Sequence, residues 1–154
     1  MSEMHPTALK VAGRLRAAGL DVEVQELDAS TRTAEEAAAA AGCELGQIVK
    51  SLVFADAGGP VLVLCAGDRR VDTALVGDEV RRATPDEVRA ATGFAIGGVP
   101  PLGHEQPVRT VVDASLRRFA TVWCAAGTPR AVFQVETERL IAAIPQADVR
   151  DVTA

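Results

Sequence analysis

The segment over residues 51–67, SLVFADAGGPVLVLCAG, constrains the fold more than any other part of the chain. Two apolar runs, 51–56 and 60–67, lie on either side of Gly58-Gly59, a pattern typical of a β-hairpin with a tight turn. Because both runs are almost continuously apolar, we expect the two strands to be central in a sheet and covered on both faces. The sequence therefore predicts a fold built around this hairpin.

Helix and strand signals flank the hairpin on both sides. The patterns predict helices over 6–18, 33–42, 73–83, 84–93 and 137–144, and further strands over 21–27, 109–114, 120–126 and 131–137. Thr33 with Glu36, and Thr84 with Glu87, form the capping-box pattern. The alanines of 33–42 indicate close packing rather than a binding surface. Together these signals predict an α/β (α+β) fold, a single domain over 1–154 with six or seven strands.

Composition and charge exclude several classes of function. No apolar run approaches the roughly 20 residues of a membrane span, so no membrane association is expected. The formal net charge of −5 argues against a general DNA or RNA binder, whose affinity comes from neutralising phosphates. The three cysteines, Cys43, Cys65 and Cys124, lack metal-ligand spacing and lie among small or apolar residues. We expect free thiols in a reducing cytoplasm, no metal and no cofactor.

Lys50 stands inside an apolar strand, which is an unusual place for an ammonium group. In an extended segment its side chain shares one face with Ile48, Leu52 and Phe54, where a charge is costly unless it reaches water or an anionic partner. Of sixteen cationic residues only Lys10 and Lys50 are lysine. Two interpretations stay open: a lysine that faces a ligand pocket, or one that extends along the strand end into solvent.

A run of glycine and proline, GFAIGGVPPLGHEQP at 93–107, is incompatible with a helix or a central strand. Such a loop suits a preformed pocket wall whose N–H groups donate to an ester carbonyl or a phosphate, although a rigid connection explains it too. Within it His104 is a pocket residue or a loop cap. The segment 124–132, CAAGTPRAV, is a hairpin in which Gly127 can also bring backbone close to a ligand.

Four motifs occur in one order along the chain: IVKSLVF at 48–54, GDRRVD at 67–72, IGGVPPLGH at 96–104 and AAG at 125–127. This combination resembles the YbaK/prolyl-tRNA-synthetase-associated domain family, which includes stand-alone aminoacyl-tRNA editing deacylases. The resemblance covers nearly the whole chain. It implies one domain around a curved mixed sheet, and hydrolysis of a small amino acid (alanine, cysteine or serine) wrongly esterified to a tRNA, most often tRNA for proline.

The resemblance also implies roles for individual residues. The family's invariant lysine corresponds to Lys50, its glycine-proline loop to Gly97, Gly98, Pro100 and Gly103, and its pocket-closing glycine to Gly127. Lys50, Gly97 and Gly98 are then expected to act in catalysis. The substrate-binding residues are expected to be Pro100, Gly103, His104, Gly127, Arg69 and Arg70. One departure from the family pattern is Thr128-Pro129-Arg130 after the last glycine.

The mechanism that follows from the resemblance relies on positioning rather than on a metal or a covalent intermediate. Lys50 would meet a phosphate or the aminoacyl end, loop amides would stabilise charge on the ester carbonyl, and a positioned water would attack. The partners would be the 3′ end of an aminoacyl-tRNA and, in addition, an aminoacyl-tRNA synthetase. The alternatives are a module that binds a nucleotide or aminoacyl-adenosine without hydrolysis, another small-ester hydrolase, and a protein adaptor.

Overall fold

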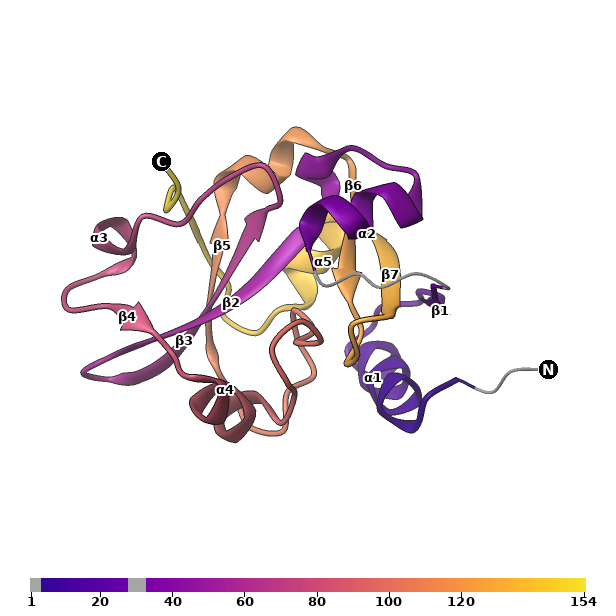
Figure 1. Ribbon diagram of the computed structural model, residues 1–154, viewed down its shortest axis with the longest axis horizontal. Coiled ribbons are helices and arrows are strands. Elements are labelled where there is room, and N and C mark those ends of the chain that lie inside the picture. Colours follow the sequence, from indigo (N-terminus) through magenta and orange to yellow (C-terminus); the bar gives the residue numbers. More distant parts are fainter. Residues whose placement is uncertain (1–3, 28–32) are drawn as a thin grey trace.

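The computed structural model describes residues 4–27 and 33–154 (Figure 1). The helices are α1 (Pro6–Ala17), α2 (Ala34–Ala41), α3 (Thr73–Val76), α4 (Pro85–Thr92) and α5 (Thr137–Ala143), with 3-10 turns η1 (Leu45–Gln47) and η2 (Ala114–Arg118). The strands are β1 (Val24–Glu26), β2 (Val49–Asp56), β3 (Gly59–Ala66), β4 (Arg81–Arg82), β5 (Arg109–Asp113), β6 (Thr121–Ala125), β7 (Ala131–Glu136) and β8 (Asp148–Arg150). Within the described ranges, none of the helices is long and apolar enough to cross a membrane.

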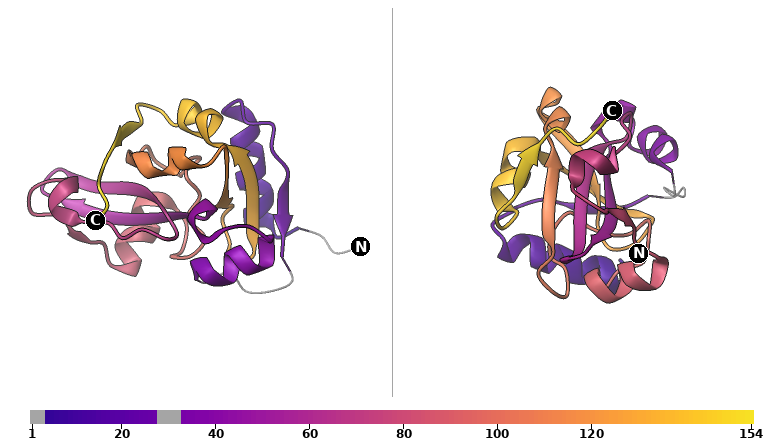
Figure 2. Two further views of the ribbon diagram at one scale, coloured as in Figure 1. Left: turned by 90° about the horizontal axis from the view of Figure 1, so that it is seen from above. Right: turned by 90° about the vertical axis from the view of Figure 1, so that its left-hand side faces the viewer.

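The strands form two sheets that meet beside β2 (Figures 1 and 2). One sheet has the order β1-β7-β6 and is antiparallel; the other has the order β4-β2-β3-β5-β8 and is mixed. A parallel bridge between Ile48 and Trp123 joins the two. The expected mixed α and β class is confirmed, but the described residues form eight strands in two sheets rather than six or seven strands in one curved sheet.

The split between the sheets follows from the pairing of β2. One edge of β2 pairs with β3 along its whole length. On the other edge, the described pairings are with β4 at Phe54 and Ala55 and the single bridge to β6 at Ile48. The backbone between these two points therefore lies in a gap between the sheets.

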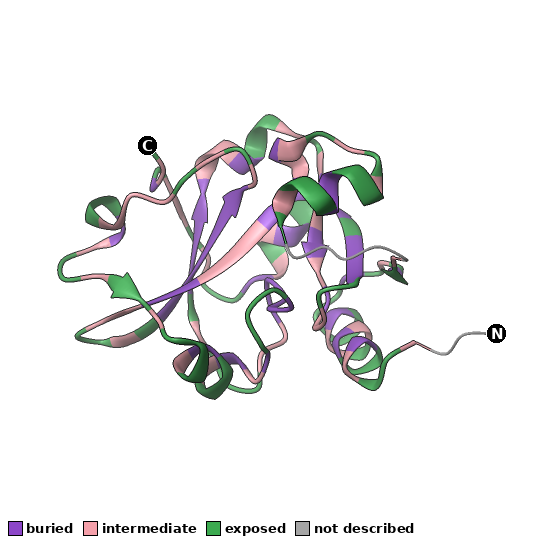
Figure 3. Cartoon of the chain, viewed as in Figure 1, coloured by how far each residue is buried: buried purple, intermediate pink, exposed green. Residues whose placement is uncertain are grey.

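The predicted hairpin over 51–67 is confirmed, with a small shift of its turn. Asp56 pairs with Gly59, so the two turn residues are Ala57 and Gly58. The Gly58 N–H donates to Asp56 Oδ1 at 2.8 Å, and Gly59 has φ 114°, which favours glycine. Every residue of β3 from Val61 to Ala66 is buried, as expected of a central strand (Figure 3).

The predicted helix over 73–83 is wrong beyond its first turn. Helix α3 ends at Val76, Gly77 is extended with φ 169°, and the short strand β4 follows. The Arg150 guanidinium, which approaches from β8, accounts for this end. It donates to the carbonyls of Leu75 and Val76 at 2.5 and 2.8 Å, so these carbonyls take a distant partner in place of the next helical turn. The predicted strand over 21–27 is also shorter, Val24–Glu26.

The main core lies between the two sheets and the helices α1 and α5. Helix α1 contributes Ala8, Val11 and Leu15, all fully buried, which follows from their helical spacing. The facing strands contribute Leu62 and Phe133, also fully buried. Helix α2 is not part of this core. It packs through its own alanines on Ile48 and Trp123, where the sheets meet.

Candidate active site

A pocket of about 190 Å³ opens at the gap beside β2. Helix α2 forms one wall, the backbone and side chains of 49–52 form another, and the turn around Gly97 and the strands β6 and β7 complete it. The lining is mostly apolar, with Lys50 as its one charged residue among those described. The other lining residues are Thr33, Ala34, Ala37, Ala41, Ile48, Val49, Ser51, Leu52, Ile96, Gly97, Val99, Trp123, Cys124, Ala125 and Val132.

The free edge of β2 presents backbone polar groups toward this gap. The Gly67 N–H donates to the Ile48 carbonyl at 2.7 Å, so this carbonyl, and by alternation the backbone groups of Lys50, face β3. The backbone N–H and carbonyl groups of Ser51 and Val53 then point away from β3, toward the other edge of β2. In agreement, the Val53 carbonyl accepts from Ala83 N–H at 3.1 Å. At Ser51 the described residues supply no neighbouring strand on that side.

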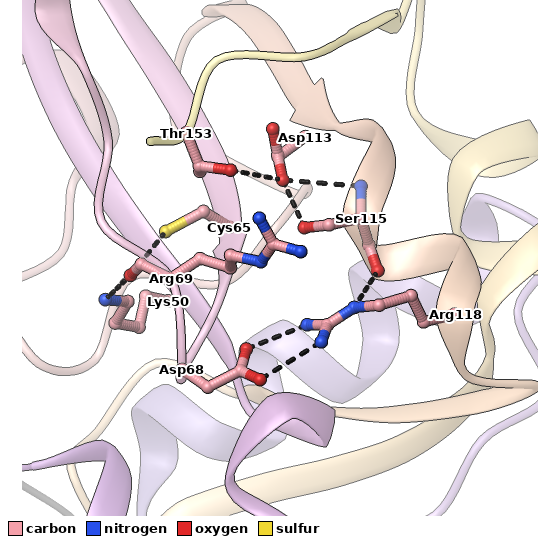
Figure 4. A network of polar contacts seen from close by, with 8 residues as sticks. All are labelled: Lys50, Cys65, Asp68, Arg69, Asp113, Ser115, Arg118 and Thr153. Carbon is pink, nitrogen blue, oxygen red and sulfur yellow. Dashed lines mark hydrogen bonds and ion pairs between the residues drawn. The ribbon is translucent and has the colours of Figure 1, made fainter.

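Lys50 lies on the pocket wall, half-buried, with its ammonium fixed by a backbone carbonyl. Its Nζ donates to the Arg69 carbonyl at 2.5 Å, and the Cys65 Sγ lies 3.9 Å from the same oxygen (Figure 4). The loop after β3 therefore holds the ammonium next to the pocket. Of the two interpretations of this lysine, the geometry favours the one that faces a pocket.

The two arginines after β3 lie differently from Lys50. The Arg69 side chain borders a separate hollow, together with Ser115, Arg118 and Thr153 (Figure 4). Arg70 is exposed. Arg118 pairs with Asp68 at 2.8 Å, and its guanidinium holds the pKa of that carboxyl below its usual range. What Arg69 brings to the pocket is its carbonyl, while its guanidinium stays outside the lining.

Asp113 ties this region to the last residues of the chain. Its buried carboxylate accepts from Ser115 N–H and Oγ and from Thr153 Oγ at 3.1 Å (Figure 4). It also accepts from Val152 N–H at 2.8 Å. Residue 152 also takes part in backbone pairing, because its carbonyl accepts from Asp72 N–H at 2.8 Å. Residues 152 and 153 therefore brace the segment that supplies the Arg69 carbonyl.

The glycine-proline loop contributes a tight turn to the pocket. The Gly98 N–H donates to the Ala95 carbonyl at 3.0 Å, and Gly97, with φ 92°, takes the third position of the turn, where a positive φ is needed. Ile96 projects from the turn at the pocket and is 53% exposed. Among the described residues, no acceptor takes the Gly97 N–H, so it can donate to a ligand.

Gly98 and Gly127 fix the position of that turn by direct backbone contact. The Gly127 N–H donates to the Gly98 carbonyl at 2.8 Å. A Cβ on Gly98 would lie 2.6 Å from the Gly127 oxygen, and a Cβ on Gly127 would lie 2.9 Å from the methyls of Thr7 and Val11. Both glycines thus locate the loop against β6 and α1, and Gly97 is the one that lines the pocket.

Pro100, Gly103 and His104 lie outside the pocket. Arg14 from α1 donates to the Gly103 carbonyl at 2.9 Å, which holds this half of the loop toward α1. His104 Nε2 donates to the Pro100 carbonyl at 2.7 Å, so the histidine closes its own loop. Burial lowers the pKa of His104, which keeps the ring neutral at pH 7. The structure therefore does not bring these three residues together with Lys50.

The cysteines are free thiols. Burial raises the pKa of Cys65 to about 11, against the opposing effect of the Lys50 ammonium, and burial also raises the pKa of Cys124. Thiols of this kind are poor nucleophiles at neutral pH. Over residues 4–27 and 33–154, no group of three or more histidine, cysteine or carboxylate side chains is arranged to hold a metal ion.

Sequence reasoning missed several residues of the pocket. The alanines of α2 were assigned to packing, yet Ala34, Ala37 and Ala41 line the cavity. Ser51 and Trp123 were not singled out at all. A signal for Ser51 was present, because a polar residue beside Lys50 interrupts an otherwise apolar strand. For Trp123 there was none, since its place depends on how β6 meets Ile48.

Comparison with known proteins gives the family. A family model described as "Aminoacyl-tRNA editing domain" matches residues 28–143, about three quarters of the chain. The chain belongs to the aminoacyl-tRNA editing domain family. The expected resemblance to the YbaK/prolyl-tRNA-synthetase-associated domains is thereby confirmed.

Relatives of this editing domain include separate proteins and parts of larger ones. YwhH of Bacillus subtilis (strain 168), itself uncharacterised, is 36% identical over 123 residues, which are 77% of this chain and 78% of YwhH. The proline–tRNA ligase of Nitratidesulfovibrio vulgaris (strain Hildenborough) is 32% identical over 129 residues, 79% of this chain but only 22% of the ligase. A solved structure of a proposed trans-editing enzyme for prolyl-tRNA synthetase is 48% identical, with a TM-score of 0.92 and 99% of each chain covered.

Proposed function

We propose that this protein is a trans-acting deacylase that hydrolyses the ester of a small amino acid on a mischarged tRNA. The observation that carries the proposal is the pocket itself. It is small, mostly apolar, open at the gap between the sheets, and has one held ammonium and a backbone turn on its walls. A pocket with these features suits an amino acid ester at the end of a phosphate-bearing chain better than it suits the flat surface of a partner protein.

In this proposal, Lys50 and the turn around Gly97 contact different groups of the substrate. The Lys50 ammonium meets a phosphate of the terminal adenosine or the aminoacyl end, as a point charge that needs no planar geometry. The Gly97 N–H, which has no acceptor among the described residues, donates to the ester carbonyl and stabilises the charge that develops there. Gly98 contributes by holding Gly97 in place.

Attack by a positioned water completes the reaction. None of the titratable side chains on the described pocket wall is a suitable base, because Lys50 is a cation and burial raises the pKa of Cys124. The substrate's own ribose hydroxyl or α-amino group is the proposed activator of the water, with no metal. Water adds to the carbonyl carbon, the tetrahedral intermediate expels the ribose oxygen with a proton, and free amino acid and tRNA result.

The size of the pocket supports a small amino acid. Alanines of α2 form one wall, so the room available is set by backbone and methyl groups on that side. Larger side chains are excluded sterically, whereas one methylene more or less changes binding by only about 1–3 kcal/mol. Alanine, serine and cysteine are the proposed class.

The proposed tRNA is tRNA for proline, with the 3′ end as the part that is bound. Similarity to proline–tRNA ligases and to a proposed trans-editing enzyme supports this choice. The formal net charge of −5 fits a protein that binds the tRNA end, with an aminoacyl-tRNA synthetase as an additional partner, better than one that wraps the tRNA body. Arg69 and Arg70 remain candidates for the phosphate-facing rim. We place this activity in the cytoplasm, where free thiols persist.

A second possible function is binding of an aminoacyl-adenosine without hydrolysis. The Lys50 ammonium already has a partner in the Arg69 carbonyl, so it is not free in the unliganded protein. Turnover of bound ester distinguishes the two functions, because a binding module would protect the ester rather than cleave it.

The test is hydrolysis of tRNA for proline charged with alanine, serine, cysteine or proline, by the wild type, Lys50→Met and Lys10→Met. Lys50→Met keeps the aliphatic stem and removes the charge. Lys10 is the chain's other lysine and pairs with Glu105 on the surface, so its variant is the matched control. We expect loss of at least one small-residue ester but not of the proline ester. Lys50→Met should be inactive, Lys10→Met active, and a chelator without effect. Ester loss no faster than in buffer would refute the deacylase.

A further inference from the structure

Ser51 carries a buried hydroxyl that nothing in the described structure satisfies. Over residues 4–27 and 33–154, its Oγ is the one buried side-chain oxygen or nitrogen without a hydrogen-bond partner. The same residue lines the pocket beside Lys50. Burying a hydroxyl without a partner costs free energy, so a ligand that supplies the partner recovers that cost on binding.

The position of Ser51 on β2 places its hydroxyl away from the ammonium of Lys50. Neighbouring residues of a strand point to opposite faces, so Ser51 shares its face with Val49 and Val53. Val49 and Val53 are buried in the main core, whereas on the other face Ile48 and Phe54 are buried in two separate clusters and Lys50 and Leu52 are half-buried. The hydroxyl therefore lies on the face of β2 that packs toward the main core, and the ammonium on the opposite face.

Several buried residues that line this pocket together with Ser51 are apolar. Val99, Cys124 and Val132 line the same cavity and are all at most 6% exposed. The part of a ligand that reaches this side of the pocket lies among apolar side chains, with the Ser51 hydroxyl as the described polar side-chain group that lacks a partner. In an aminoacyl ester whose ribose and phosphate remain at the mouth near Lys50, that part is the amino acid side chain.

We infer that Ser51 reads the side chain of the amino acid, and that the site prefers a hydroxyl-bearing side chain of the serine class over an apolar side chain of equal size. This inference rests on the proposed deacylase function and narrows its substrate class. A hydroxyl suits the position because it can both donate to Ser51 Oγ and accept from it. An apolar side chain leaves the Ser51 hydroxyl unpaired in the complex, as it is in the free protein.

The test compares two esters that differ only in this group. Serine and 2-aminobutyrate have side chains of the same length, one ending in a hydroxyl and the other in a methyl. The measured quantity is the ratio of their deacylation rates on the same tRNA, at limiting substrate, for wild type, Ser51→Ala and Ser51→Cys. One neutral hydrogen bond predicts a wild-type ratio of roughly 3–10 in favour of serine. Ser51→Ala should bring that ratio to about 1 by slowing the seryl ester.

Ser115→Ala is the matched control, since Ser115 is the other serine in the described ranges. Its hydroxyl is satisfied by Asp113 and lies outside the pocket. This variant should lower the melting temperature and leave the ratio unchanged. Ser51→Ala should change the ratio without lowering the melting temperature, because it removes a hydroxyl that has no hydrogen-bond partner in the free protein. Ser51→Cys should give an intermediate ratio, since a thiol hydrogen-bonds weakly.

The outcomes separate this inference from the proposed function. If the wild type hydrolyses neither ester, nor any small-residue ester on the tRNA, the deacylase itself fails. If it hydrolyses both but the ratio is near 1, or is the same in Ser51→Ala, then Ser51 does not read the side chain and the inference is overturned. A fall in melting temperature for Ser51→Ala with an unchanged ratio would assign the hydroxyl a structural role instead.

Discussion

Gly98→Ala tests whether the contact between the two loops positions the site. The added Cβ would lie 2.6 Å from the Gly127 oxygen and 2.8 Å from its carbonyl carbon, and both atoms belong to backbone. Ordinary contact begins at 3.4 Å, so the oxygen must move by the difference between 2.6 and 3.4 Å, which is 0.8 Å. Gly127 is itself closely packed against α1, because a Cβ built on it would lie 2.9 Å from the methyls of Thr7 and Val11. The glycine-proline loop must therefore move instead.

The expected cost combines two effects of this movement. Overpacking of a well-packed contact typically costs about 1–3 kcal/mol. The hydrogen bond from Gly127 N–H to the Gly98 carbonyl contributes about 0.5–1.5 kcal/mol more if it breaks. A loss of about 2–4 kcal/mol in the free energy of unfolding follows, which is about 1–2 M in the urea midpoint. A displacement of this size at Gly97 should slow deacylation by up to about a hundredfold.

The assay pairs urea unfolding with single-turnover deacylation, and Gly13→Ala is the matched control. Gly13 is exposed in α1, and a Cβ added there would have nothing within 4 Å, so alanine should stabilise the helix by about 0.5–1 kcal/mol. Activity should be unchanged in that variant. If Gly98→Ala unfolds at the wild-type urea concentration and deacylates at the wild-type rate, the reasoning from the close contact is refuted.

Two further predictions address the pocket wall and the surface. Ala37→Leu should fill part of the pocket and slow deacylation, most strongly for the larger of two esters, while Ala40→Leu on the exposed face of α2 should not; relative rates on alanyl and 2-aminobutyryl esters test this. The Arg81 guanidinium lowers the pKa of Glu87 from 4.5 to about 2, so the pair stabilises the folded state above pH 4.5 and this stabilisation is lost as the pH falls toward 2. Arg81→Ala should therefore melt below the wild type at pH 6, with a gap that closes by pH 2; a gap independent of pH would contradict this.

The elements that could be predicted from sequence are those fixed by local signals. The β2–β3 hairpin follows from two apolar runs and glycines, and α2 and α4 begin at the capping boxes of Thr33 and Thr84 as expected. The prediction of a helix over 73–83 was wrong because Arg150, more than seventy positions away, donates hydrogen bonds to the carbonyls of its first turn. A local pattern carries no information about such a partner.

The candidate site could be predicted only where a residue conflicted with its own surroundings. Lys50 was found because an ammonium does not belong in an apolar strand, and the structure does bring it to a pocket with Gly97. The loop was treated as one unit, so its members were expected together. In the structure, Arg14 donates to the Gly103 carbonyl, and Gly103 lies outside the pocket that Gly97 lines. The alanines of α2 were expected to serve packing alone, because the sequence does not distinguish an alanine that packs against a core from one that lines a cavity.

The bracing of Asp113 by residues 152 and 153 has a consequence for how this chain is made. These residues must be present before the loop that holds Lys50 is secured, and they follow Lys50 by about a hundred positions. At roughly 5–20 residues per second, synthesis leaves the β2–β3 hairpin without its final neighbours for about 5–20 s. During that time its apolar strands are open to pairing with other nascent chains. The yield of folded protein in the cell should therefore depend on chaperone supply and on translation speed over residues 60–153, even where the finished protein is stable.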